Sequence, residues 1–161
     1  MKKALSSINA GCAWLSGALL LVILATILYE VAARFAFNHA ATWAFDLTSY
    51  GLLFVIFLAA ARTLEQGGHI RIDFFLGYLN ARNKLRAEVL AQALSVLFLA
   101  ILLWATALEL REVVQSGAES PSMSAIPLRY IDWIMPLGAL LMLLTGLVKL
   151  GAAVSRTAES R

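Results

Sequence analysis

The chain is divided into two apolar halves by one polar stretch, Arg62-Thr-Leu-Glu-Gln-Gly-Gly-His-Ile-Arg-Ile-Asp73. Gly67 and Gly68 within this stretch predict the end of a helix, because glycine readily adopts the left-handed backbone conformation that closes helices. Charges of both signs surround the two glycines, and apolar residues return directly after them. We therefore expect a polar hairpin that joins two long apolar helices.

His69 in the same stretch has a second interpretation, as a metal ligand together with Glu65 and Asp73. Structural and catalytic metal sites usually combine several strong ligands, and this sequence places no second histidine near His69. The hairpin interpretation is therefore favoured, and we predict no metal site.

The composition is that of a membrane protein. Of the 161 residues, 61% are hydrophobic and only 14% are charged, whereas a soluble domain has roughly 25% charged residues. A membrane-spanning helix needs about 20 largely apolar residues. Four runs without charge reach that length alone or with flanking residues: Ala4–Tyr29, Leu47–Ala61, Val89–Leu108 and Trp133–Val148. The sequence therefore predicts an all-α integral membrane protein, with four transmembrane helices in one domain over residues 1–161.

We expect these helices at about 11–35, 43–64, 81–112 and 128–154, with a short interfacial helix over 73–79 between the second and the third. Pro127 suits the first turn of the last helix, where its missing N–H costs nothing. Pro136, with Gly138 nearby, is expected to bend that helix from within.

The basic residues predict the orientation. If both termini lie on one side with the central hairpin, that side carries ten of the 13 lysine and arginine residues, and the other side carries Arg34, Arg111 and Arg129. Basic residues are retained in the cytoplasm. Both termini are therefore predicted to be cytoplasmic, and the net charge of +3 reflects orientation rather than nucleic-acid binding.

Three ionisable residues are expected at membrane depth: Glu30, Arg34 and Asp46. Such residues are functional candidates by default. One interpretation is a proton or cation relay, with one carboxylate left over after Arg34 takes a partner. The other, which we favour, is a structural ion pair near the outer interface, in which the guanidinium serves both carboxylates.

Other kinds of chemistry find little support. His39 and His69 both fall in predicted links, whereas axial haem ligands have to lie deep within the helices. The single cysteine, Cys12, excludes an internal disulfide. We find no nucleophile-base-acid set and no phosphate-binding loop, so we predict neither an enzyme nor a cofactor.

Motifs along nearly the whole chain resemble the small membrane subunit (DctQ type) of tripartite ATP-independent periplasmic (TRAP) transporters. They are Arg34-Phe-Ala-Phe-Asn38 with Trp43-Ala-Phe-Asp46, then Arg62 leading into Gly68-His-Ile-Arg-Ile-Asp73, then Ser120-Pro121 leading to Pro136-Leu-Gly138. This sequence departs from the family at Asp46, where a glutamate is usual. The motif residues that we carry over are Trp43, Arg62, Gly68, His69, Asp73, Pro127, Pro136 and Gly138.

The resemblance implies a function in transport. Members of this family are scaffolds in the bacterial inner membrane for a much larger, sodium-coupled membrane subunit. That subunit imports an organic anion, typically a carboxylate, which a periplasmic binding protein delivers. By this resemblance, the present chain holds no substrate-binding site.

Two other functions stay open at this stage. One is a small proton-coupled multidrug exporter that acts as a homodimer, with Glu30 as the coupling carboxylate; such a protein needs its acid near mid-helix, and Glu30 lies toward one end. The other is a membrane anchor of a redox complex, against which the histidine positions argue. Transporter substrate sites usually show interrupted helices at mid-depth, so the plain interiors of the first three helices favour the scaffold.

Overall fold

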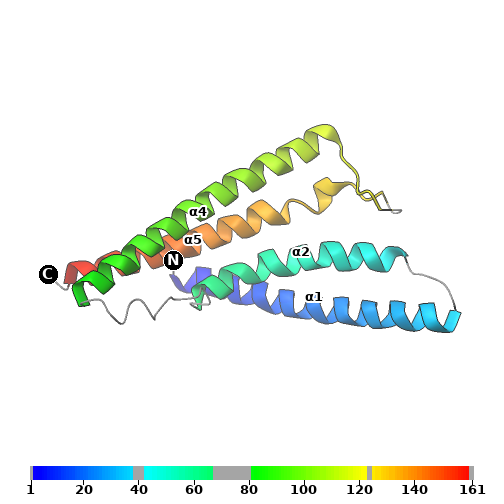
Figure 1. Ribbon diagram of the computed structural model, residues 1–161, viewed down its shortest axis with the longest axis horizontal. Helices are drawn as coiled ribbons and strands as arrows, with labels where there is room; N and C mark the ends of the chain where they lie inside the picture. Colours follow the sequence, from blue (N-terminus) through cyan, green and yellow to red (C-terminus); the bar gives the residue numbers. More distant parts are fainter. Residues whose placement is uncertain (1, 38–41, 67–80, 123–124, 160–161) are drawn as a thin grey trace.

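The computed structural model describes residues 2–37, 42–66, 81–122 and 125–159, and they form four long helices (Figure 1). Helix α1 spans Lys2–Phe37, α2 spans Thr42–Glu65, α4 spans Ala81–Ser116 and α5 spans Ile134–Glu159, with a short 3-10 helix, η1, at Leu128–Tyr130. No strand occurs among these residues. All four long segments have the length and apolar composition to cross a membrane, which confirms the predicted all-helical chain with four apolar helices.

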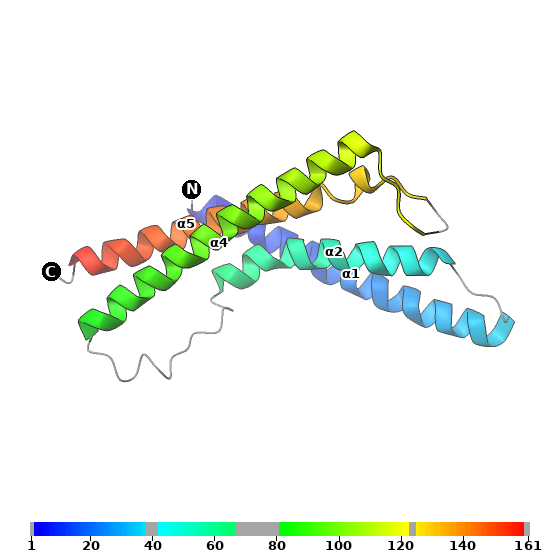
Figure 2. The ribbon, with the colours of Figure 1, turned by 45° about the horizontal axis from the view of Figure 1, so that its top comes forward.

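The helices form two antiparallel hairpins, α1 with α2 and α4 with α5 (Figure 1). Helix α2 packs against α5 and joins the hairpins, so the four helices follow the order α1, α2, α5, α4 across the molecule. The two hairpins diverge toward the end where α4 leads into η1 (Figure 2). The N-terminus, the C-terminus and the end of α2 lie toward the opposite end.

Glycines permit the closest approaches between helices. A Cβ atom added to Gly138 of α5 would lie 2.7 Å from Cβ and 2.9 Å from the carbonyl oxygen of Phe57 in α2. At Gly51 of α2, an added Cβ would lie 2.9 Å from Cδ1 of Ile23 in α1. Small residues let helix backbones approach in this way within lipid, so both contacts depend on the missing side chain.

Large apolar side chains cover much of the outer surface. Trp14 and Phe35 of α1 are 83% and 96% exposed, and Trp104 of α4 is 70% exposed. Apolar surface on this scale marks contact with lipid or with another protein. The described helices thus bury little within the chain itself and leave most of their apolar side chains for other contacts.

Helix α1 begins earlier than expected, at Lys2 instead of about residue 11, and α4 continues to Ser116 instead of about residue 112. The early start of α1 has a packing reason. Asn9 is fully buried and bonded to both α2 and α5, so the segment before residue 11 is held as helix by tertiary contacts. The predicted interfacial helix over 73–79 lies outside the described residues.

The structure interrupts the helix expected over 128–154 near its start. Helix η1 ends at Tyr130, three residues form turns, and α5 begins at Ile134. Pro136 is the third residue of α5, so it starts a helix instead of bending one. Proline has no N–H to donate and clashes with the preceding turn, and it is therefore accommodated only in the first turn. Leu137 next along the chain donates its backbone N–H to the oxygen of Trp133 at 3.4 Å.

Candidate functional site

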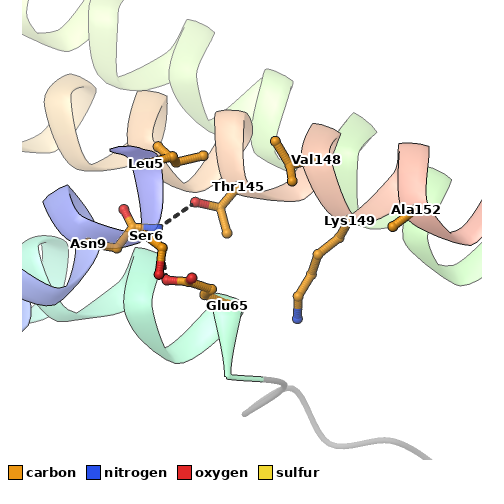
Figure 3. Close-up of a pocket in the computed structure, with 8 residues that line it drawn as sticks. All are labelled: Leu5, Ser6, Asn9, Glu65, Thr145, Val148, Lys149 and Ala152. Atoms are coloured by element: carbon orange, nitrogen blue, oxygen red, sulfur yellow. Dashed lines mark hydrogen bonds between the residues drawn. The ribbon is translucent and has the colours of Figure 1, made fainter. Parts of the chain in front are cut away.

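The end of the bundle that holds both termini carries a buried polar cluster built from α1, α2 and α5. Asn9 of α1 lies at its centre and is fully buried. Its Nδ2 donates to Oγ1 of Thr145 in α5 at 3.0 Å (Figure 3) and to Oε2 of Glu65 in α2 at 3.3 Å. A hydrogen bond between helices in lipid contributes roughly 1 kcal/mol. The Asn9 side chain therefore connects α1 and α2 of the first hairpin with α5 of the second.

An ion pair within α2 extends this cluster. Nη1 of Arg62 lies 3.0 Å from Oε2 of Glu65 and also donates to Oγ of Ser6 in α1 at 3.3 Å. Both charged side chains are about one-third exposed, so their attraction is screened and contributes little stability by itself. The pair nevertheless holds the Glu65 carboxylate where Asn9 can reach it.

Lys149 of α5 joins the same cluster. Its ammonium group donates a hydrogen bond to the backbone oxygen of Leu64, in the last turn of α2. The final carbonyls of a helix have no partner within the helix, and a cation stabilises the negative end of the helix dipole. Lys149 of α5 therefore caps the C-terminal end of α2, which belongs to the other hairpin, and adds a polar contact between these two helices.

A pocket of about 270 Å³ opens beside the cluster, and its two sides differ in character. Figure 3 shows Leu5 and Val148 above Thr145, and Glu65 and Lys149 below it. Oδ1 of Asn9 is buried and accepts no hydrogen bond from any described residue. The pocket is thus amphipathic, with charged groups on one side and aliphatic side chains on the other.

The residues predicted to act at the opposite end are only partly brought together. Arg34 forms an ion pair with Glu30, one turn away in α1, and the Arg34 side chain is 64% exposed. Asp46 of α2 is buried, and its Oδ2 has no hydrogen-bond partner among the described residues. The described structure therefore contains a local pair, Glu30 with Arg34, and does not join Asp46 to it.

The connection between α4 and η1 is fixed against α2. The hydroxyl groups of Tyr50 and Ser120 are hydrogen-bonded, and Oγ of Ser120 donates to Oγ of Ser122 at 2.9 Å. Within the connection, the backbone N–H of Ser120 donates to the oxygen of Ile126 at 2.8 Å. Polar contacts therefore join the two hairpins at this end of the bundle as well.

The family-motif residues lie at several separate places. The ring of Trp43, at the start of α2, lies 5.9 Å from that of Tyr29, about two turns before the end of α1. Pro127 precedes η1 and forms an isolated backbone bridge with Glu119. Arg62 belongs to the polar cluster. Pro136 lies in the first turn of α5, and Gly138, in the same helix, contacts Phe57 of α2. Gly68, His69 and Asp73 lie outside the described residues, so nothing follows for them.

Two central residues of the cluster, Asn9 and Thr145, were missed in the sequence analysis. Their signal was a polar side chain beside or within an otherwise apolar run, because a buried polar group is costly unless it is hydrogen-bonded. Among the described residues, no three histidine, cysteine or acidic side chains come together as a metal site would require. The chemistry of the cluster is that of helix association.

Comparison with models of known protein families matches residues 23–156 to the family described as tripartite ATP-independent periplasmic transporters, DctQ component. That family is non-enzymatic, and its systems contain a large membrane subunit and a periplasmic binding protein. A comparison with curated proteins found no match.

Proposed function

Since this chain belongs to the DctQ family of small membrane subunits in TRAP transporters, we propose that it is the scaffold for the large membrane subunit of its transporter. The large subunit would couple sodium to the import of an organic anion, such as a carboxylate, that the periplasmic binding protein delivers. This chain would bind no substrate itself and would anchor the part of the transporter that does not move.

The observation that carries this proposal is the distribution of apolar and polar groups. An apolar stripe runs along the outer face of α4, through Leu94, Phe98, Ile101 and Leu108, all of them at least 43% exposed. Charged residues are absent from the middle of the four apolar spans. A transport pathway needs polar groups or broken helices at mid-depth. Apolar outer faces with polar joins at both ends are suited to packing against a partner.

We further propose that the chain is a multi-pass protein of the bacterial inner membrane with both termini in the cytoplasm. The support is the excess of basic residues at the end that carries the termini. With this orientation, the polar cluster lies on the cytoplasmic side and Ser120 lies on the periplasmic side, where the binding protein would dock.

The test is purification of the tagged chain from native membranes, followed by identification of what accompanies it. We expect a stable complex with one large multi-spanning subunit. Truncating Phe98 and Ile101 to alanine together tests the α4 face, and truncating Leu20 and Leu24 tests the α1 face. Because these four side chains are exposed, the fold of the chain should persist while the yield of complex falls for at least one pair.

Two results would contradict the scaffold. One is a chain that purifies only as a homodimer and transports substrate by itself in proteoliposomes, as the exporter alternative requires. The other is a complex whose yield is unchanged by both pairs of truncations.

A further inference from the structure

We propose that the end of α4 that leads into η1 receives a basic side chain, lysine or arginine, from the large membrane subunit. The site consists of three carboxylates that form no ion pair within the described part of the chain: Glu109, Glu112 and Asp132. This inference rests on the scaffold function proposed above, and it adds the place and the chemistry of one contact with the large subunit.

Asp132, in the turn between η1 and α5, is the member of this site that most needs a partner. The residue is only 8% exposed, and none of the hydrogen bonds or ion pairs among the described residues involves its carboxylate. Neither oxygen is fully enclosed, because the enclosed oxygens without a partner in that part of the chain belong to Asn9 and Asp46. A buried carboxylate is costly unless it is paired, and this one can still be reached by a group from another molecule.

The charged residues near Asp132 do not neutralise it. The charge that acts on Asp132 is the like charge of Glu109 in α4. Arg129 of η1 lies with its guanidinium 4.9 Å from the centre of the Tyr130 ring and donates to the Tyr130 hydroxyl, and it forms no ion pair with Asp132. Arg111 follows Glu109 by two residues and therefore lies about 200° further around α4. A neutralising positive charge is thus expected from a partner.

The two glutamates continue the apolar stripe on the outer face of α4. Residues four apart share a helix face, and Glu112 follows Leu108 of that stripe by four residues, about 6 Å along the axis. Glu109 and Glu112 are both exposed, and this end of α4 contacts η1 (Figure 1). A helix of the large subunit that covers the stripe would therefore meet the carboxylates one turn beyond its own apolar part. Lipid phosphate groups are negative and would be repelled there, so a basic protein side chain is the better match.

A role for Asp132 within the chain leads to a different expectation. Its carboxylate lies two residues before α5, and the N-terminal end of a helix favours a negative charge. The backbone N–H groups of Ile134 and Met135, however, donate to the backbone oxygens of Ile131 and Asp132. If the carboxylate stabilised α5, Asp132→Asn would lower the melting temperature of the isolated chain. If the carboxylate awaits a partner, the same substitution removes an uncompensated buried charge, and the melting temperature stays the same or rises.

The experiment compares the isolated chain with its complex. The tagged chain is produced together with its large subunit, and the dissociation constant of the purified pair is measured in detergent. Asp132→Asn should weaken the complex about tenfold or more, because the basic group of the partner loses its buried counter-charge. Glu112→Lys should also weaken it, through repulsion of the same basic group. The control, Glu119→Gln, removes a charge from an exposed residue beyond α4 and should leave the affinity unchanged.

The possible failures can be told apart. A wild-type complex whose affinity is kept in both Asp132→Asn and Glu112→Lys overturns this inference and leaves the scaffold function standing. A lower melting temperature of the isolated Asp132→Asn chain assigns the carboxylate to α5 and overturns it too. If the two variants lose binding of the periplasmic binding protein, or of phosphatidylethanolamine, but not of the large subunit, the site has a different occupant and the proposal fails. Absence of any complex with the wild-type chain refutes the scaffold function itself, and this contact with it.

Discussion

Replacing Gly138 by alanine should push α2 and α5 apart. The added Cβ would lie 2.7 Å from Cβ, 2.8 Å from Cδ1 and 2.9 Å from the carbonyl oxygen of Phe57. Rotating the Phe57 side chain relieves only the contact with Cδ1, because the other two atoms are fixed to the α2 backbone. Ordinary contacts begin at 3.4 Å, so the helices would have to separate by about 0.7 Å at this point.

The effect of Gly138→Ala on the free energy of unfolding is the sum of two opposing contributions. Overpacking a tight contact costs about 1–3 kcal/mol, while alanine favours the helix over glycine by up to about 1 kcal/mol. Gly151 lies in the same helix and has no atom within 4 Å of an added Cβ, so Gly151→Ala retains only the favourable effect. We therefore expect Gly138→Ala to be less stable than Gly151→Ala by about 2 kcal/mol.

Thermal unfolding of both variants in the same detergent measures this difference. For a chain of this size, about 2 kcal/mol corresponds to roughly 4–8 °C in melting temperature. Crosslinking between cysteines placed on α2 and α5 should also slow in Gly138→Ala, because the helices lie farther apart. Equal melting temperatures for the two variants would refute the close contact between Gly138 and Phe57.

Two further predictions concern the opposite end. Arg34→Ala should change the free energy of unfolding by less than about 0.5 kcal/mol, because its ion pair with Glu30 is exposed; a loss of several kcal/mol in a denaturation series would show that Arg34 also holds a second helix. Tyr50→Phe should cost about 1 kcal/mol and speed hydrogen exchange at Ser120, because the bond between the two hydroxyl groups is lost. Tyr29→Phe is the control, and equal exchange in both variants would contradict the contact.

The four long helices of the described residues could be predicted from the charge-free runs alone, because a segment that crosses lipid has to be apolar and to satisfy its own backbone hydrogen bonds. The helix ends could not be predicted in the same way. The first helix was expected to begin at about residue 11, after Asn9, because the partner that holds Asn9 in the helix, Thr145, lies 136 residues away in the sequence. Contacts over such separations depend on how the hairpins pack, and no local pattern encodes that packing.

The contacts of the ionisable residues could likewise be predicted only where the partners are close in sequence. Glu30 and Arg34 are four residues apart and therefore share a helix face, and the structure pairs them. All three ionisable residues were expected at membrane depth, but depth does not determine how a helix is rotated about its own axis. In the structure, the ring of Trp43 lies against that of Tyr29, while Asp46 is buried apart from the ion pair.

The location of the polar cluster at one end of the helices bears on how the chain is made. Thr145 follows Glu65 by 80 residues, so at about 5–20 residues per second the first hairpin exists for roughly 4–16 s before its partner is synthesised. During that interval, Asn9 lacks the hydrogen bond to Thr145 that α5 later provides. Near the headgroup layer, water can solvate the Asn9 amide in the meantime, whereas at mid-membrane the amide would have no such partner. A polar contact between hairpins at the edge of the bilayer therefore allows the newly synthesised first hairpin to remain stable until the second hairpin inserts beside it.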